Sequence, residues 1–531
     1  MRLILALVVV GFVSFFFGLG WVGLIGPDES RYAQVARGMM ERADWATPQL
    51  RGEPWLDKPP LYYWAAAGSM WLLGETETAA RLPAATAALA TCFAIAFVGT
   101  RWFGFAAGLR SALVLAASLG MVLYGRAAIM DSLLTLSLTI GLGAYALYVT
   151  VRPSLAWLVT AFAAIGAGVL AKGPVAVVLP LLIIVPFHLL DRLGHRSGSR
   201  RLTVPTATHV LVSVASFLVV VIPWHAAILQ RMGWEFVEVF FFQHNVDRFL
   251  TTVHRHPGPI YYYLPVLAVA LFPWSAFAPA AIARAMRGIE ARRTFLLLWI
   301  VSPLVFFSLS GAKLPGYVLP VLPPFALSIG LLWAPLDKSG KEETAGWLNR
   351  SLAFHAAWGV VLGAAALRGL PGGIPEMATA GRWLAVLLVG LGAGAYVIGR
   401  ERPGAAFWSL TASSVSLTLL VVLYLAPIVE PYQSLKTLAT KGHSELNPGE
   451  RVICYKAFYP RALFYTRDRL GEIWTLEEFR IRAAEWGRIV TLTEPQHYRE
   501  IAEDASLETH VIARSGNRLL LEARPASAAS R

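Results

Sequence analysis

Apolar segments recur along the chain from the N-terminus to about residue 426. A helix that crosses a bilayer needs about 17–25 mostly apolar residues, and the pattern predicts roughly thirteen such segments. Their ranges are 3–25, 82–100, 104–124, 131–150, 154–171, 173–190, 207–228, 260–282, 294–310, 317–335, 351–367, 382–399 and 405–426. Residues 1–429 are therefore predicted to form a polytopic α-helical membrane domain. For the first segment, Arg2 followed by an apolar run also fits a signal peptide, but the length of the run favours a helix.

The sequence changes character at about residue 430. Short runs rich in β-forming residues alternate there with helical patterns. The strand-like runs are 451–455, 488–492, 509–512 and 518–521, and the helical patterns are 475–487 and 495–505. Residues 430–531 are therefore predicted to form a small α/β domain that ends in a disordered Pro-Ala-Ser segment.

Composition strengthens the membrane prediction. The 531 residues are 56% hydrophobic and only 15% charged, with a mean hydropathy of +0.56. A soluble chain carries roughly a quarter charged residues, so this composition excludes a soluble globular protein. The net charge of +13 would suggest nucleic acid in a soluble protein, but no nucleic-acid partner is expected here.

The positive charge instead predicts how the helices run through the membrane. Arginine and lysine residues concentrate in alternate loops, and such loops normally face the cytoplasm. This bias places the N-terminus in the cytoplasm and the C-terminal domain in the periplasm or another extracytoplasmic space. Two long loops, 26–81 and 229–259, then share the outer face, where the functional site is expected.

The first outer loop contains a helical pattern that starts at Asp28, directly after a proline. An apolar stripe formed by Tyr32, Val35, Ala36 and Met39 predicts a helix that lies along the membrane surface. Carboxylates such as Asp28 and its neighbour are also common at the start of any helix, because they complement its dipole. The residue types alone leave the functional and the structural interpretation open.

Further polar residues are predicted on the same outer face. They are Arg126, Asp131, Lys172, the stretch 243–249, His254, His256, and the stretch 313–317. Singly, each could be a side chain that reaches the membrane interface, although ionisable residues at membrane depth are usually functional. Several cations that share one face with acidic residues would suit an anionic, phosphate-bearing ligand. His254 and His256 form only a weak metal-binding pattern, because they are two residues apart.

These motifs resemble those of the GT-C membrane glycosyltransferases, in particular the bacterial aminoarabinose–lipid A transferases and the protein O-mannosyltransferases. The matching stretches, in order, are Pro-Asp-Glu-x-Arg-Tyr-Ala at 27–33, Asp44-Trp45, Lys58-Pro-Pro-Leu-x-Tyr-Trp64, Met130-Asp131, Ala171-Lys-Gly-Pro174, 240–263, and Lys313-Leu-Pro-Gly-Tyr-x-Leu-Pro320. The resemblance implies a thirteen-helix GT-C fold with outer-face amphipathic helices and a small extracytoplasmic C-terminal domain. It also implies sugar transfer from a polyprenyl phosphate, typically undecaprenyl phosphate, in the bacterial inner membrane.

By the same resemblance, Asp28 is the leading catalytic carboxylate and Asp131 a second acidic residue. Glu29, adjacent to Asp28 in the sequence, is a further catalytic candidate. The residues expected to contact or support binding of the carrier phosphate are Lys58, Arg248, Tyr317, Arg31 and Lys313. Arg31 would orient Asp28. The family's usual glutamate before Lys-Pro-Pro is Asp57 in this chain, so a divalent metal stays open, with Asp57, His254 and His256 as weak candidates.

The residue types agree with this chemistry. Breaking the bond between the sugar C1 and a phosphate oxygen places growing negative charge on the phosphate, which lysine, arginine and tyrosine donors stabilise. A carboxylate can deprotonate the acceptor hydroxyl, and a single direct displacement inverts the anomeric carbon.

The predicted function is thus transfer of a sugar to lipid A or another envelope glycolipid. Transfer to protein Ser or Thr is the alternative within the same class. A lipid flippase is the alternative from a different class, although no paired, similarly interrupted spans of a transporter are evident.

Overall fold

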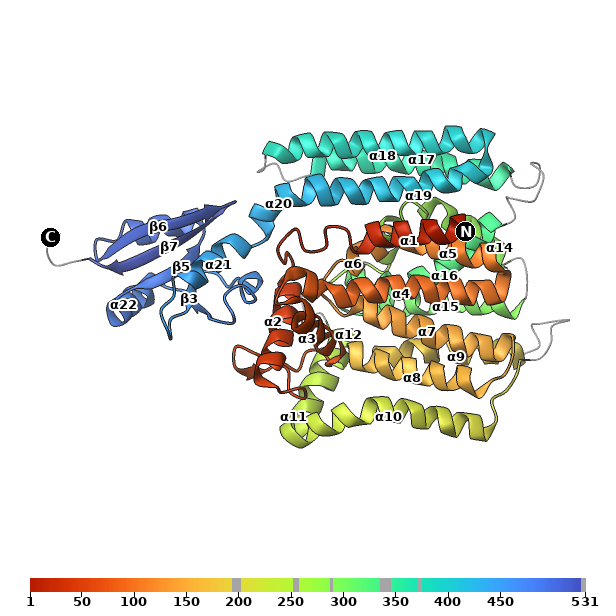
Figure 1. The fold of residues 1–531 in the computed structure, drawn as a ribbon, viewed down its shortest axis with the longest axis horizontal. Helices are drawn as coiled ribbons and strands as arrows, with labels where there is room; N and C mark the ends of the chain where they lie inside the picture. Colours follow the sequence, from red (N-terminus) through yellow and green to blue (C-terminus); the bar gives the residue numbers. More distant parts are fainter. Residues whose placement is uncertain (193–201, 252–256, 287–289, 335–344, 370–374, 527–531) are drawn as a thin grey trace. The chain divides into compact units, whose positions relative to one another are not determined.

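The structure is a computed structural model and describes residues 1–192, 202–251, 257–286, 290–334, 345–369 and 375–526 (Figure 1). The chain divides into two compact units whose segments alternate along the sequence. The helical unit consists of Met1–Phe17, Leu56–Tyr62 and Leu82–Tyr424, and the α/β unit consists of Gly18–Trp55, Tyr63–Arg81 and Leu425–Arg531. The outer loop predicted at 26–81 is therefore shared between both units.

Within the described residues, ten helices are long and apolar enough to cross a membrane. They are α4 (Glu77–Phe103), α7 (Asp131–Thr150), α8 (Leu155–Lys172), α9 (Val175–Arg192), α10 (Ala207–Met232), α15 (Ala291–Leu309), η3 with α16 (Pro315–Val321 and Leu322–Trp333), α17 (Ala345–Gly369), α18 (Pro375–Glu401), and α19 continuing through η5 into α20 (Pro403–Leu420, Val421–Leu425 and Ala426–Gln433). In the helical unit, α7 packs against α8, α8 against α10, α9 against α15, and α17 against α18.

Two further predicted spans are bent pairs of helices rather than single helices. In the first, α5 (Phe105–Ala116) and α6 (Leu119–Gly125) differ in direction by 63°. In the second, α13 (Tyr263–Ala270) is followed by η2 (Ser275–Phe277) and α14 (Ala278–Met286) at 116°. The second break contains Pro273, which has no N–H to continue a helix. Counting each pair as one span gives up to 12 spans in the described residues, and the predicted total stays a prediction.

The first helix is shorter than the sequence pattern predicts. Helix α1 (Arg2–Phe15) ends ten residues before the end of the predicted span 3–25. The chain then turns through Gly18, whose φ of 64° lies in the left-handed region that glycine adopts easily. The apolar composition of 16–25 concealed this turn, because hydropathy alone does not register the spacing of glycines.

The second outer loop, predicted at 229–259, contains regular structure. Helix α10 is followed by α11 (Trp234–Phe236), the π-helical segment η1 (Val237–Asp247) and α12 (Arg248–Leu250). Residues 252–256 lie outside the described residues, as do 193–201 and the end of the predicted Pro-Ala-Ser segment, 527–531.

A five-stranded sheet forms the core of the α/β unit, in the order β4-β3-β5-β7-β6. Its strands are β3 (Val452–Tyr455), β4 (Leu470–Ile473), β5 (Ile489–Thr493), β6 (Leu507–Ser515) and β7 (Arg518–Pro525). Strand β3 pairs in parallel with β4 and β5, and β7 pairs antiparallel with β5 and β6. All four strands predicted in the tail are present, whereas β4, with Gly471 and Glu472 in its centre, was not predicted.

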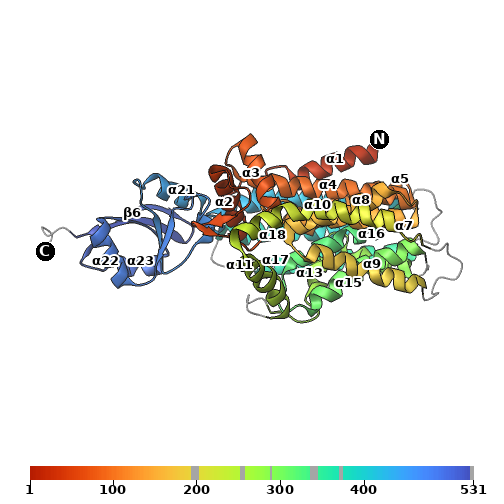
Figure 2. The same cartoon turned by 90° about the horizontal axis from the view of Figure 1, so that it is seen from below.

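Helices lie on both faces of this sheet (Figure 2). Helices α22 (Leu476–Trp486) and α23 (Pro495–Ala502) cover one face, where Ile453, Tyr455 and Phe479 belong to one buried apolar cluster. Helix α21 (Lys436–Ser444) covers the other face, and its Gly442 lies close to Val452 and Leu520. The period-two alternation of a strand explains why 452 and 453 face opposite sides.

An ion pair beside β5 gives this unit a pH-dependent stability. The Arg488 guanidinium donates to both carboxylate oxygens of Glu450, at 3.1 and 2.9 Å, and this hydrogen bonding lowers the pKa of Glu450 from 4.5 to about 2. A carboxyl with a lowered folded-state pKa stabilises the fold above its unfolded pKa, and that contribution is lost as the pH falls through the folded value.

We therefore expect the segments around 450 and 488 to lose stability progressively between about pH 4.5 and pH 2. Hydrogen exchange of peptides covering these segments, corrected for the intrinsic exchange rate at each pH, measures this loss. The Arg488→Gln variant should be less stable at neutral pH and show a flatter pH dependence. Parallel pH profiles of the two proteins would contradict this assignment.

Candidate functional site

The leading catalytic candidate, Asp28, lies in the first turn of α2 (Pro27–Arg42) in the α/β unit. Proline at the first helical position fits a helix start, since its missing N–H has no partner there in any case. The Asp28 side chain is 56% exposed, and the Arg31 guanidinium donates to its Oδ1 at 3.3 Å. Arg31 also lies over the Trp55 ring, with 6.0 Å from Cζ to the ring centre. Asp28 is thus a solvated carboxylate oriented by the arginine predicted to orient it.

Helix α2 is held by its buried face. The predicted stripe of Tyr32, Val35, Ala36 and Met39 is at most 5% exposed, which corrects the expectation of an apolar face laid on lipid. Ser30 is also fully buried: its hydroxyl donates to the Arg461 carbonyl at 3.0 Å and accepts the Phe464 N–H at 3.1 Å. The helix is therefore attached to the segment around η6 (Pro460–Ala462) of the same unit.

A buried arginine, Arg81 at the start of α4, holds the turn that precedes α2. Its guanidinium donates to both Glu29 carboxylate oxygens at 2.9 and 3.1 Å. It also donates to the main-chain carbonyls of Leu19, Val22 and Gly23, each at 2.9 Å. The five N–H groups of an arginine can all be satisfied in this way. We call Arg81, Glu29 and these three carbonyls the Arg81 clamp.

The clamp changes the interpretation of Glu29. Its side chain is only 9% exposed, and beside the two Arg81 bonds it accepts the Ile25 N–H at 3.0 Å. A base must have a free lone pair directed at the proton it removes, whereas these contacts direct the Glu29 oxygens into the protein. The geometry favours a structural role for Glu29, and its catalytic assignment has no support in these contacts.

A second group of polar side chains lies in the helical unit, around the Lys58-Pro-Pro motif that precedes α3 (Leu61–Leu73). The Lys58 ammonium donates to Asp57 Oδ1 at 2.6 Å, and His244 Nδ1 of η1 lies 3.2 Å from the same oxygen. The side chains of Lys58 and Asp57 are only 11% and 16% exposed. The carboxylate therefore fixes the position of a partly buried cation.

The same group contains side chains of the types that bind metals. Asp57 and His244 supply two donors that metals accept, and zinc sites in proteins normally use three or four protein ligands. Within the described residues, no group of three or more His, Cys, Asp or Glu side chains could hold a metal ion. His254 and His256 lie outside the described residues. The described donors alone are too few for such a site, and a divalent metal stays a prediction.

A third group forms where α7 begins and α8 ends. The Lys172 ammonium, at the C-terminus of α8, donates to Asp131 Oδ1 at the N-terminus of α7 over 2.6 Å. Each charge complements the dipole of its own helix, and the two side chains are only 15% and 13% exposed. The Lys172 ammonium also lies 5.3 Å from the centre of the Tyr317 ring in η3, a cation–π distance.

The glycine beside Tyr317 permits this close packing. A methyl group added at Gly316 would come within 2.9 Å of Asp131 Oδ1 and 2.7 Å of a Tyr124 ring carbon. Such contacts are too short for any side chain, so the Lys-Leu-Pro-Gly-Tyr motif needs its glycine to bring the tyrosine up to the ion pair.

Lys313 and Arg248 are the remaining candidates for the phosphate site. Lys313 is 8% exposed, and its ammonium donates to the Ser310 carbonyl at 2.7 Å. Arg248 begins α12, but its side chain lies outside the described residues.

Three groups thus emerge: Asp28 with Arg31, Asp57 with Lys58 and His244, and Asp131 with Lys172 and Tyr317. Lys172 and His244 were not among the residues assigned to the site from sequence. For Lys172 the signal was present, because it is a lysine at the end of an apolar span inside the Ala-Lys-Gly-Pro motif. For His244 only the polar run 243–245 could have drawn attention.

Comparison with known proteins agrees with these motifs. The family model for "Dolichyl-phosphate-mannose-protein mannosyltransferase" matches residues 5–234. An undecaprenyl phosphate-α-4-amino-4-deoxy-L-arabinose arabinosyl transferase of Pectobacterium atrosepticum is 31% identical over 65% of this chain and 61% of its own length. The protein of the same name from Yersinia enterocolitica is 31% identical over 57% of this chain and 54% of its own length. The chain thus covers less than two thirds of the length of these relatives.

The fold comparison extends over nearly the whole chain. The crystal structure of ArnT from Cupriavidus metallidurans bound to undecaprenyl phosphate matches with a TM-score of 0.83, covering 98% of this chain and 97% of that one at 23% identity. The chain has the GT-C fold of the ArnT type. The matched family model and the sequence relatives agree with this fold. An ArnT-type fold with these apolar helices is that of a multi-pass membrane protein.

Proposed function

We propose that this ArnT-type protein transfers a sugar of the 4-amino-4-deoxy-L-arabinose kind from undecaprenyl phosphate to lipid A. The observation that carries the proposal is a pair of lysines in the helical unit, Lys58 and Lys172, each held on a carboxylate and each only slightly exposed. The sequence relatives, which are named for this donor, support the choice of sugar and carrier.

On the donor side, Lys58 and Lys172 stabilise the phosphate that leaves. Their ammonium groups are positioned before the donor arrives, so little rearrangement is needed as negative charge develops on the phosphate oxygen. The Tyr317 ring lies beside the Lys172 ammonium, and its hydroxyl is proposed as a further donor to the phosphate. Arg248 and Lys313 are proposed as supporting cations, as the sequence predicted. The leaving phosphate is already a stable anion and needs no proton.

On the acceptor side, Asp28 acts as the general base. It removes the proton from the acceptor hydroxyl while that oxygen attacks C1 of the sugar. The bond between C1 and the phosphate oxygen breaks in the same step, and undecaprenyl phosphate departs with both electrons of that bond. One displacement of this kind inverts the anomeric carbon. Arg31, which donates to Asp28 Oδ1, keeps the carboxylate directed.

We also propose how the chain is oriented in the membrane and in which membrane it lies. The concentration of arginine and lysine in alternate loops supports an N-terminus in the cytoplasm and an extracytoplasmic C-terminal domain. Transfer then takes place at the outer face of the bacterial inner membrane, where lipid A is accessible.

Purified protein reconstituted with undecaprenyl phosphate-linked aminoarabinose and lipid A tests the proposal. Mass spectrometry should detect sugar-modified lipid A and an equal amount of undecaprenyl phosphate. A Ser/Thr peptide supplied in parallel should stay unmodified, and its modification in place of lipid A would support the O-mannosyltransferase alternative, to which the matched family model is a distant link. Movement of an intact donor across the bilayer without cleavage would indicate a transporter.

Lys58→Ala should raise the KM for the donor by about tenfold to a hundredfold, since a hydrogen bond to a charged group contributes about 1.5–3 kcal/mol. Initial rates at varied donor concentration measure this change. Lys441→Ala is the matched control, because Lys441 pairs with Glu445 on the exposed surface of α21 and should leave the KM unchanged. An unaltered donor KM in Lys58→Ala would remove this lysine from the phosphate site.

A further inference from the structure

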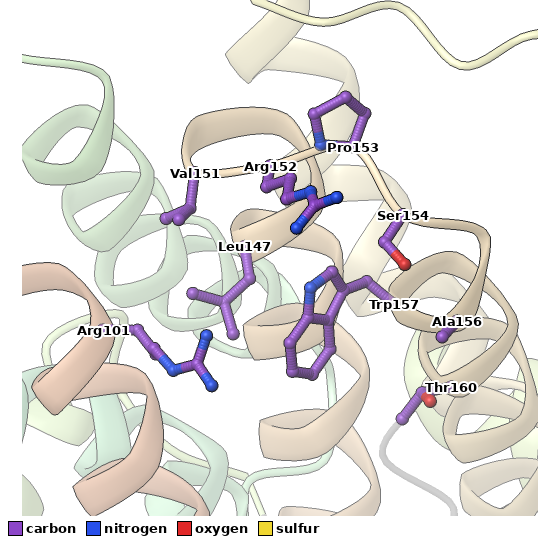
Figure 3. Close-up of a pocket in the computed structure, with 9 residues that line it drawn as sticks. All are labelled: Arg101, Leu147, Val151, Arg152, Pro153, Ser154, Ala156, Trp157 and Thr160. Atoms are coloured by element: carbon purple, nitrogen blue, oxygen red, sulfur yellow. The ribbon is translucent and has the colours of Figure 1, made fainter.

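A cavity of about 470 Å³ lies where α4 and α7 end and α8 begins. Two arginines line it, Arg101 from α4 and Arg152 from the turn after α7, together with Ser154, which precedes α8, and Trp157 of α8 (Figure 3). Figure 3 shows both guanidinium groups directed towards the space around the Trp157 indole. None of these residues takes part in the proposed reaction.

Among the described residues, no carboxylate pairs with the positive charge of this cavity. No acidic residue is among those that line the cavity, and in the part of the chain that the structure describes neither guanidinium forms an ion pair. Arg81, by contrast, is fully occupied by protein acceptors. Two arginines that share a cavity without a counter-charge attract an anion, and the planar guanidinium is suited to phosphate.

An apolar stripe continues from the cavity along α4. Phe93, Phe97 and Arg101 are spaced four residues apart and lie on one face of the helix. The Arg101 guanidinium lies over the Phe97 ring at 4.9 Å, and that ring is 5.7 Å from Trp157. Phe93 and Phe97 are 48% and 41% exposed. A ligand that combines an anionic head with an apolar chain would match both the cavity and the stripe.

The cavity is also distinct from the proposed donor site. Asp131 starts α7 and Arg152 follows its end, so 20 helical residues separate them, which corresponds to about 30 Å. In α8, Trp157 of the cavity lies near the start of the helix and Lys172 of the donor site lies at its end. This separation equals the thickness of the hydrocarbon core of a bilayer, about 30 Å, so the cavity faces the opposite leaflet.

We propose that this cavity binds the phosphate of an anionic phospholipid, with Arg101 and Arg152 on the phosphate, the Ser154 hydroxyl and the Trp157 indole beside the headgroup, and an acyl chain along Phe97 and Phe93. Basic cavities between membrane helices at this interface are suited to such headgroups. Bound lipid fixes the ends of α4, α7 and α8 relative to one another at the membrane surface.

Native mass spectrometry of the purified full-length protein, with phosphatidylglycerol or phosphatidylcholine added, tests the proposal. Wild type should retain phosphatidylglycerol in preference to phosphatidylcholine. The Arg101→Gln/Arg152→Gln variant should bind phosphatidylglycerol about ten- to thirtyfold more weakly. Both arginines are exposed, so the variant should fold, and its elution and thermal unfolding should match those of wild type.

The matched control is Arg400→Gln/Arg402→Gln, which removes the same charge at the end of α18, away from the cavity. It should bind phosphatidylglycerol within about twofold of wild type. Equal losses in the two double variants would overturn the proposal, because charge alone would then explain the binding. Displacement of the lipid by millimolar inorganic phosphate would overturn it as well, because the site would then take a soluble anion.

Discussion

Asp28→Asn should lower the rate of sugar transfer by about 10²–10⁴-fold, the range typical for loss of a general base. Asparagine keeps the size of the side chain and can still contact Arg31, but it cannot take the proton from the acceptor hydroxyl. Because Asp28 is exposed at the start of α2, the substitution should leave the fold intact. The rate should be measured at saturating donor, so that the loss reports the chemical step rather than binding.

Glu41→Gln serves as the control for this experiment. Glu41 lies near the other end of α2 and pairs with Arg467 at 3.1 Å, so the change removes one exposed carboxylate of the same helix without touching Asp28. It should retain wild-type transfer. Wild-type activity in Asp28→Asn would show that Asp28 is not the general base. This conclusion would not depend on the residues proposed for the donor site.

Arg81→Ala should destabilise the turn before α2 by about 3–5 kcal/mol, because it leaves the Glu29 carboxylate buried without its counter-charge. It also removes donors from three main-chain carbonyls at once. Hydrogen exchange of peptides covering 19–32 should become faster throughout. The rate of sugar transfer should also fall, because Asp28 lies on the segment that is no longer held.

Two further variants separate the clamp from ordinary ion pairing. Arg467→Ala removes an arginine that also pairs with two carboxylates, at 3.1 and 2.6 Å, but is half exposed; exposed pairs contribute only about 0–1 kcal/mol. Glu29→Gln keeps an acceptor for Arg81 and removes the charge. Its hydrogen-exchange rate over 19–32 should therefore lie between those of Arg81→Ala and Arg467→Ala. Similar exchange in Arg81→Ala and Arg467→Ala would show that the clamp does not hold the turn.

The sequence predicted the positions of the helices and strands better than the residues at which they end. Hydropathy located an apolar helix or bent pair at each predicted span, and the start of α2 followed from Pro27 and Asp28. The strands of the tail followed from their β-forming residues. The early end of α1 escaped prediction because the residues after Phe15 are as apolar as those before it.

The site was predictable only in part, because its contacts join residues far apart in sequence. Periodicity could place Glu29 at a helix start, but it could not show that Arg81, 52 residues later, occupies both of its oxygens. Lys172 and Asp131 were each visible as charged residues at the end of an apolar span, yet their pairing depends on how α7 packs against α8. Such contacts come from tertiary packing rather than from local pattern.

The alternation of the two units along the chain has a consequence for synthesis. Helix α2 leaves the ribosome among the first residues, whereas Arg461 and Phe464, which hold its Ser30, are made more than four hundred residues later. Until translation is nearly finished, the helix that carries Asp28 has no such partners. In a chain that stops early, Ser30 of α2 therefore lacks both of the hydrogen bonds that it forms in the finished protein.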